Sequence, residues 1–172
     1  MPIDTDQQVT VLGLGYIGLP TAALIARSGC RVTGVDVSEK VVETVNSGKV
    51  HIEEVDLDGL VQGVVARGAL TASTEVAPAD SFVIAVPTPH DADHRPDISY
   101  VLAAARAIAP QLQAGNLVIL ESTSPVGTTE KVAALIAELR PDLKVPGACA
   151  GAADIFIAYC PERVLPGRIL VE

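Results

Sequence analysis

The sequence has few of the features that mark secreted or disulfide-rich proteins. Its 172 residues include no tryptophan and only three cysteines, Cys30, Cys149 and Cys160, with no Cys-x-x-Cys spacing. An odd number of cysteines without that spacing is typical of reduced cytosolic thiols and not of a disulfide framework. The first eight residues, MPIDTDQQ, are polar and acidic. We therefore expect no secretory signal of the usual type.

Basic residues and long apolar runs are also scarce. Lysine and arginine number 12 against 21 acidic residues, which gives a formal net charge of −9. This balance offers no basic patch for the phosphates of a nucleic acid, so a nucleic-acid partner is excluded. Apolar residues make up 49% of the chain, but charges interrupt every stretch before it reaches the roughly 20 residues of a membrane helix. These features predict a cytoplasmic, globular, single-domain protein without membrane association.

Short apolar segments rich in β-branched residues alternate with helical patterns along the whole chain. The predicted strands are 9–12, 31–35, 81–86, 117–120 and 154–158, with a weaker one at 70–72. The predicted helices are 16–28, 39–46, 57–66, 98–109 and 129–139. Alternation with such short connections requires right-handed crossovers, and it predicts an α/β fold with a doubly wound parallel sheet and helices on both faces. Residues 140–154 form the loosest segment, which we expect to be an exposed connection.

Three glycines lie where the first strand gives way to the first helix. Gly13, Gly15 and Gly18 form a G-x-G-x-x-G pattern. The first glycine permits a tight turn, the second lets a diphosphate approach the backbone, and the third allows the helix to pack closely on the strand. The unpaired N–H groups of the helix start can then bind the diphosphate. The pattern alone is weak evidence, because glycine-rich turns also form for steric reasons.

A carboxylate at the end of the second strand strengthens this interpretation. Asp36 comes 18 positions after Gly18, close to the spacing of about 20 expected for the group that binds the adenine ribose. A carboxylate there accepts hydrogen bonds from the ribose hydroxyls and repels the 2′-phosphate of NADP, so it favours NAD over NADP. The alternative is that Asp36 caps the helix that starts near Ser38. Together the glycines and Asp36 predict a Rossmann-type domain that binds NAD.

Three further polar stretches follow predicted strands. They are VPTPHDADHRPD (86–97), ESTSPVGTTE (121–130) and YCPERVLPG (159–167). Ligands of open α/β sheets bind at the carboxyl ends of strands, so we expect all three to border one crevice. Prolines on both sides of Thr88 fix its hydroxyl, and Thr123 directly follows a strand. Thr129 opens a helix, where it could serve only as an N-cap.

Metal binding and a local nucleophile are weaker alternatives. A small cluster of potential metal ligands consists of His90, Asp91, Asp93 and His94. Its spacing fits no helix face, and acidic loop residues are usually solvated, so we predict no metal site. A reactive thiol needs a cationic or helix-start setting, and Cys160, with Arg163 nearby, is the only cysteine with a hint of one.

Five ordered motifs together resemble the UDP-glucose/GDP-mannose dehydrogenase family. They are GLGYIGLPTA, GVDVSEK, VPTPHDADHRPDISYV, ILESTSPVGTTEK and IAYCPERVLPGRILVE, and they cover nearly the whole chain. Members of this family oxidise a sugar C6 alcohol to a carboxylate in two steps, each of which consumes one NAD. In these enzymes a cysteine captures the aldehyde, and the resulting thioester is hydrolysed.

The resemblance assigns roles to individual residues. For the adenosine half of NAD it implies contacts with Gly13, Gly15, Tyr16, Ile17, Gly18 and Asp36. Thr88 and Thr129 would line the nicotinamide side. Thr123 would orient the catalytic water or a substrate oxygen, and Glu162 would lie beside the reacting C6 as a general base or electrostatic partner. Arg163 and Val164 would touch the sugar nucleotide. From the residues alone, Glu162 could instead be a surface carboxylate paired with Arg163.

The last motif and one departure from the family pattern narrow the expected substrate, and a second departure concerns the nucleophile. YCPERVLPG resembles members that act on UDP-N-acetyl-D-mannosamine. Members that act on UDP-glucose usually carry a second glutamate four residues past the one matching Glu162, where this chain has Pro166. The family's nucleophilic cysteine lies in a Gly-Gly-His-Cys stretch that this sequence does not contain.

We therefore expect residues 1–172 to be the NAD-binding domain of such an enzyme, without its central helix and C-terminal UDP-sugar domain. The chain should bind NAD without turnover, and the full-length protein should be a homo-oligomer that binds a UDP-sugar. The alternatives are a stand-alone regulatory dinucleotide-binding module, a dehydrogenase for another UDP-sugar, and a hydroxy-acid dehydrogenase. The tripeptide GLP after the glycine pattern and the phrase PERVLPG argue against the last.

Overall fold

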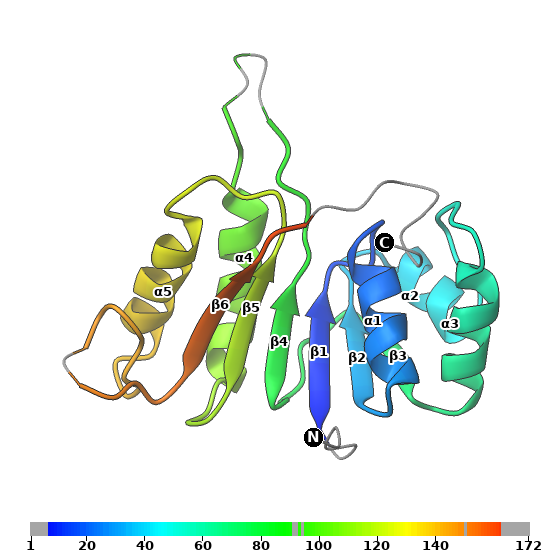
Figure 1. Cartoon of the computed structure of the whole chain (residues 1–172), viewed down its shortest axis with the longest axis horizontal. Helices are drawn as coiled ribbons and strands as arrows, with labels where there is room; N and C mark the ends of the chain where they lie inside the picture. Colours follow the sequence, from blue (N-terminus) through cyan, green and yellow to red (C-terminus); the bar gives the residue numbers. More distant parts are fainter. Residues whose placement is uncertain (1–6, 91–92, 94, 150, 163–172) are drawn as a thin grey trace.

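The protein forms a six-stranded parallel sheet with the strand order β3-β2-β1-β4-β5-β6 (Figure 1). The computed structural model describes residues 7–90, 93, 95–149 and 151–162. The strands are β1 (Gln8–Leu12), β2 (Arg31–Val35), β3 (Leu70–Ser73), β4 (Ser81–Ile84), β5 (Leu117–Glu121) and β6 (Phe156–Cys160). The strand order reverses between β1 and β4, and ligands bind doubly wound sheets at such a switch point. The predicted doubly wound, Rossmann-type fold is confirmed.

Helices cover both faces of the sheet. They are α1 (Gly18–Arg27), α2 (Glu39–Asn46), α3 (Leu57–Ala66), α4 (Ser99–Ile108) and α5 (Thr128–Leu139), with a 3₁₀ turn η1 at Ala109–Gln111. Helices α1, α2 and α3 pack on one face, whereas α4 and α5 pack on the other (Figure 1). No helix in the described part of the chain is long and apolar enough to cross a lipid bilayer.

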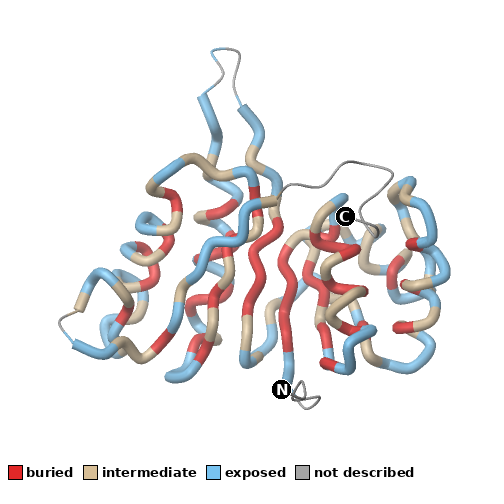
Figure 2. The backbone as a smooth tube through the Cα atoms, viewed as in Figure 1, coloured by how far each residue is buried: buried red, intermediate tan, exposed pale blue. Residues whose placement is uncertain are grey.

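The central strands contribute side chains to two separate cores. On β4, Phe82 and Ile84 join the core under α4 and α5, and Val83 joins the core under α1 and α3. This division follows from the two-residue period of a strand, whose successive side chains point to opposite faces. Strands β1 and β4 are therefore buried, whereas β6 at the edge of the sheet is largely exposed (Figure 2).

Several predicted boundaries differ from the structure by one or two residues. The last strand begins at Phe156 and not at 154, because Asp154 bonds instead to the segment after α5: its carboxylate accepts a hydrogen bond from the Lys144 N–H at 2.9 Å. Strand β4 ends at Ile84 and not at 86, just before the proline-rich stretch. Helix α1 begins at Gly18 and not at 16, since Gly15, Tyr16 and Ile17 form the turn that precedes it.

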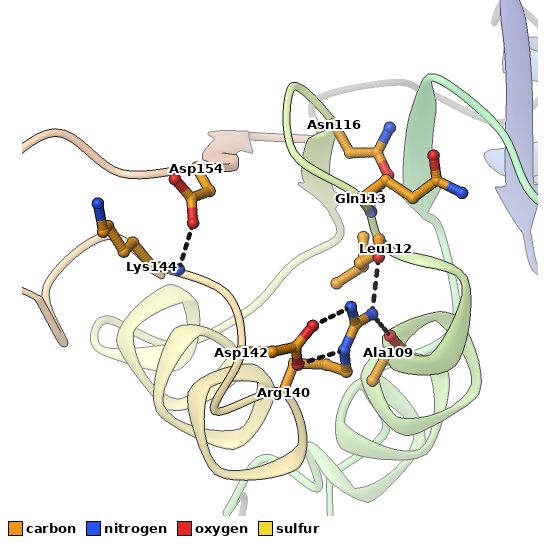
Figure 3. A network of polar contacts seen from close by, with 8 residues as sticks. All are labelled: Ala109, Leu112, Gln113, Asn116, Arg140, Asp142, Lys144 and Asp154. Atoms are coloured by element: carbon orange, nitrogen blue, oxygen red, sulfur yellow. Dashed lines mark hydrogen bonds and ion pairs between the residues drawn. The ribbon is translucent and has the colours of Figure 1, made fainter.

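A polar network joins the ends of α4 and α5 on the side of the sheet where the strands begin (Figure 3). The Arg140 guanidinium donates to the carbonyl oxygens of Ala109 and Leu112, at 2.8 and 2.6 Å, and forms a two-point ion pair with Asp142. These bonds satisfy carbonyl groups at the end of η1 and join it to the end of α5. The network therefore has a structural role, away from the carboxyl ends of the strands.

Candidate functional site

Each of the three glycines of the first turn is glycine for a different structural reason. Gly13 has φ +89°, and a Cβ there would lie 2.8 Å from the Ala85 carbonyl oxygen. A Cβ on Gly18 would lie 1.7 Å from the carbonyl oxygen of Gly13. Gly15, by contrast, is exposed, and a Cβ there would meet nothing within 4 Å. Gly13 and Gly18 therefore build the turn, and Gly15 leaves open the space through which a diphosphate can approach.

The start of α1 is available for an anion. No side chain caps this helix, and its first turn contains no acidic residue. The unpaired amides and the positive end of the helix dipole therefore face the turn at Gly15 and Tyr16 without a competing group. A diphosphate is the ligand that such a glycine turn and helix start suit best.

Asp36 is held in place by two backbone groups at the end of β2. Its Oδ2 accepts from the Leu14 N–H at 3.0 Å, and its Oδ1 accepts from the Ser38 N–H at 2.9 Å. The N-cap of α2 is Ser38, whose own hydroxyl accepts from the Val41 N–H. Asp36 thus steadies the helix start but is not the cap itself. Each carboxylate oxygen keeps a second lone pair, so the group can still accept from two ribose hydroxyls.

A cleft of about 670 Å³ runs along the carboxyl ends of the central strands. Its size is within the usual range for a small-molecule site. The cleft is lined by Leu12, Gly13, Gly15, Tyr16, Ile17, Val35, Asp36, Val37, Thr74, Val76, Ala85, Val86, Pro87, Thr88, Tyr100, Ala103, Ala104, Ala107, Glu121, Ser122, Thr123 and Glu162. It joins the end that holds Asp36 to the end that holds Thr88 and Thr123, with the glycine turn between them.

The two ends of the cleft differ in chemistry. Around Asp36 the lining is apolar and small, with Val76 and the alanines of α4 beside it, and these suit a flat base next to a ribose. The other end, beyond the glycine turn, has hydroxyl and carboxyl groups from the ends of β4, β5 and β6. A dinucleotide with its adenosine at Asp36 and its diphosphate at Gly15 would extend its nicotinamide toward this second end.

Hydrogen bonds connect the strand ends around this second end. The Thr88 hydroxyl donates to the carbonyl oxygen of Thr123 at 3.0 Å, which joins the segments after β4 and β5. The Thr123 hydroxyl in turn donates to Glu162 Oε2 at 3.4 Å, and the Tyr159 hydroxyl donates to the Ser122 carbonyl at 3.2 Å. The three polar stretches predicted to border one crevice do so.

Two predicted site residues in the described part of the chain, Gly18 and Thr129, do not line the cleft. Gly18 lies behind the turn, and Thr129 is the second residue of α5, outside the lining. The alternative that Thr129 caps α5 is wrong, because the N-cap is Gly127 and no side chain caps this helix. Arg163 and Val164 lie outside the described residues.

The cysteines and the histidine-rich loop add little to the site. All three cysteines are free: Cys30 is buried in a core, Cys149 is partly buried, and Cys160 is exposed at the end of β6. None of them lines the cleft. In the loop, His90 forms an isolated bridge with Pro96, while Asp91 and His94 lie outside the described residues.

Sequence reasoning missed one carboxyl group, that of Glu121 at the end of β5. The Thr21 hydroxyl of α1 donates to its Oε1 at 3.3 Å, and its Oε2 is buried without a partner. Burial is the largest effect and raises the pKa of Glu121; the hydrogen bond from Thr21 lowers it, and the charge of Glu162 raises it. An acidic residue that ends an apolar strand just before Ser122 and Thr123 was the available signal.

Replacing Asp36 by asparagine should reduce the preference of this domain for NAD over NADP. The wild-type chain should bind NAD at least about tenfold more tightly, a difference of about 1.4 kcal/mol, because the anchored carboxylate accepts from ribose hydroxyls and repels a 2′-phosphate. Asparagine removes the charge and half of the acceptor capacity, so NAD binding should weaken and NADP binding should improve. Calorimetric titration with both nucleotides measures the two affinities.

The matched control is Glu39→Gln, which removes a charge from the exposed surface of α2. It should leave both affinities unchanged. Equal affinities for NAD and NADP in the wild-type chain would show that Asp36 does not have the assigned role.

Comparisons with known proteins agree with this geometry. The NAD-binding domain of the UDP-glucose/GDP-mannose dehydrogenase family matches residues 7–172. The UDP-N-acetyl-D-mannosamine dehydrogenase of Escherichia coli K12 is 56% identical over 95% of the chain, and the match spans 39% of that protein. The NDP-N-acetyl-D-galactosaminuronic acid dehydrogenase of Ralstonia nicotianae is 53% identical over 99% of the chain and 40% of its own length.

A solved structure gives the same result. The UDP-N-acetyl-mannosamine dehydrogenase of Staphylococcus aureus superposes with a TM-score of 0.84 at 40% identity. The superposition covers 95% of this chain and 38% of that one. The chain thus spans about two fifths of the length of the relatives it matches.

Proposed function

This chain belongs to the UDP-glucose/GDP-mannose dehydrogenase family and forms its NAD-binding domain, and we propose that the enzyme of which it is part is a UDP-N-acetyl-D-mannosamine 6-dehydrogenase. Such an enzyme oxidises the sugar C6 alcohol to a carboxylate with two NAD. The observation that carries the proposal is the cleft that joins Asp36, the glycine turn and the pair Thr123–Glu162. The identity of 56% to the Escherichia coli enzyme supports the choice of sugar.

In this proposal the domain binds and orients NAD, which accepts a hydride at each oxidation. The amides at the start of α1 hold the diphosphate, and Asp36 holds the adenine ribose. Thr123 holds Glu162 by a hydrogen bond at the nicotinamide end. From that position Glu162 can take a proton from the sugar alcohol or from the hydrolytic water. Thr129, Arg163 and Val164 complete the proposed contacts with the cofactor and the sugar nucleotide.

The remaining parts of the reaction are assigned to residues outside this chain. None of the three cysteines lines the cleft, so we propose that the aldehyde is captured by a cysteine of a further domain. That domain would also hold most of the UDP-sugar. We further propose that the complete protein is a homo-oligomer and that it is cytoplasmic, which its free cysteines support.

The proposal predicts that residues 1–172 bind NAD but do not form NADH from UDP-N-acetyl-D-mannosamine. Hydride transfer requires the alcohol to be held about 3–3.5 Å from the nicotinamide, and such positioning supplies roughly 7–11 kcal/mol of the barrier. Joining these residues to the downstream part of the Escherichia coli relative should restore that positioning. The absorbance of NADH then measures turnover, with two NADH expected for each sugar.

Three other sugar nucleotides serve for comparison: UDP-N-acetyl-D-glucosamine, UDP-N-acetyl-D-galactosamine and UDP-glucose. The chimera should oxidise each of them much more slowly than UDP-N-acetyl-D-mannosamine. The downstream part alone is the control and should be inactive. A chimera that binds NAD but oxidises none of the four sugars would contradict the proposal. Sustained NADH formation by the 172 residues alone would also contradict it and would make Cys160 the first candidate nucleophile.

A further inference from the structure

Glu121 occupies an unusual position for a carboxyl group. It lines the cleft at the end of β5, between Thr21 of α1 and the hydroxyl-rich end that contains Ser122 and Thr123. One of its oxygens, Oε1, accepts from the Thr21 hydroxyl, and the other, Oε2, is buried without a partner. A buried polar atom without a partner costs free energy comparable to a lost hydrogen bond, and more when it is charged.

Among the described residues that line the cleft with Glu121, the charged side chains are all acidic. The other titratable side chains that line the cleft are Tyr16 before α1, Asp36 after β2, Tyr100 on α4 and Glu162 after β6. Among the described lining residues there is no lysine, arginine or histidine. Of these groups, Glu162 acts on Glu121 electrostatically, and it disfavours the ionised form, as burial does. Burial and the charge of Glu162 therefore raise the pKa of Glu121 above that of an exposed glutamate.

We propose that Glu121, which lines the cleft, lies beside the nicotinamide ring of the bound cofactor and distinguishes NAD⁺ from NADH by the charge of that ring. The proposal rests on the placement of nicotinamide at this end of the cleft. The ring of NAD⁺ is positively charged and that of NADH is neutral, so only the oxidised cofactor stabilises an ionised carboxylate beside it.

The proton balance of the two binding events follows directly. When NAD⁺ binds, the positive ring lowers the pKa of Glu121, so that protonated Glu121 carboxyl groups release their proton to solvent and stay ionised beside the ring. NADH brings no such charge, and its binding leaves the protonation of Glu121 unchanged. The affinity for NAD⁺ should therefore rise with pH, while that for NADH should stay constant. The ratio of the two affinities should increase several-fold between pH 5.5 and pH 8.

The test uses the 172-residue chain and three ligands: NAD⁺, NADH and ADP-ribose, which lacks nicotinamide. Calorimetry at pH 6 in two buffers of different ionisation enthalpy counts the protons released. We expect release with NAD⁺ only. Glu121→Gln keeps the size of the side chain but cannot ionise, so it should abolish both the release and the pH dependence. It should also weaken NAD⁺ binding about tenfold at pH 8, with ADP-ribose unaffected.

Two further variants separate Glu121 from its neighbours. Glu138→Gln changes an exposed glutamate of α5 and should leave every measurement unchanged. Glu162→Gln should reduce the proton release, because the charge of Glu162 helps to raise the pKa of Glu121, whereas burial still raises it in the variant. Persistence of the release in Glu121→Gln, or a larger release in Glu162→Gln than in the wild type, would overturn the proposal. Equal weakening of NAD⁺ and ADP-ribose by Glu121→Gln would overturn it as well, since the change would then act on the whole cleft. None of these readouts requires turnover of a sugar, so they are independent of the proposed dehydrogenase activity.

Discussion

Replacing Gly18 by alanine should abolish measurable NAD binding and lower the free energy of unfolding by about 3 kcal/mol or more. The added Cβ would lie 1.7 Å from the Gly13 carbonyl oxygen and 2.9 Å from its carbon. Both are backbone atoms of the turn and cannot rotate away. Relief would require α1 to move off the strand, a distortion at the upper end of the 1–3 kcal/mol usual for overpacking.

The same movement would destroy the diphosphate site. Gly13 is fixed on its other side by the hydrogen bond from its N–H to the Val35 carbonyl at 2.8 Å. The turn therefore cannot shift as a unit, and the helix amides would lose their position relative to Asp36. Urea unfolding followed by circular dichroism measures the stability, and calorimetric titration with NAD measures the affinity.

Two other glycines provide matched controls for this substitution. Gly59→Ala, inside α3, places a Cβ in open space and should raise stability by up to about 1 kcal/mol through helix propensity. Gly15→Ala also meets no atom within 4 Å and should leave the fold intact, but its Cβ would obstruct the diphosphate. A Gly18→Ala variant with the stability and NAD affinity of the wild type would refute the role assigned to the turn.

The sequence predicted the fold and the adenosine end of the cleft because both depend on local patterns. A short apolar strand, three glycines and a carboxylate 18 positions later lie in one continuous stretch. The physical reasons for Gly13 and Gly18 operate between residues of the same turn or of adjacent strands. The alternation of strands and helices then predicted a doubly wound parallel sheet, since right-handed crossovers leave few topologies; the strand order itself comes from the structure.

The nicotinamide end could be predicted less completely because it depends on contacts between distant segments. Glu121 meets Thr21 of α1, 100 positions earlier in the chain, and only the folded structure reveals its buried oxygen. Strand β6 begins two residues later than predicted because Asp154 bonds to Lys144, ten positions earlier, a contact that no strand pattern encodes. For the same reason neither the hydroxyl of Thr88 nor that of Thr123 could be assigned its partner from the sequence.

Replacing Glu162 by glutamine should lower kcat of the chimeric enzyme by about 10²–10⁴-fold, the range typical of a general acid or base. Glutamine has the same size and can still accept the hydrogen bond from Thr123, which is 3.4 Å long in the wild type. It cannot take a proton from the sugar alcohol or from water. The NAD affinity should stay within about twofold, because the change leaves the glycine turn and Asp36 untouched.

The pH profile of kcat distinguishes a proton-transfer role from a structural one. A carboxylate base is lost when it is protonated, so the wild-type rate should fall on the acid side of the profile, and this fall should be absent in Glu162→Gln. Glu43→Gln, on the exposed surface of α2, is the matched control and should change neither the rate nor the profile. If Glu162 were only part of a surface ion pair, worth roughly 0–1 kcal/mol, its replacement would change kcat by less than about fivefold. An unchanged acid limb with such a small effect would exclude Glu162 as the base and would leave proton transfer to a residue of the second domain.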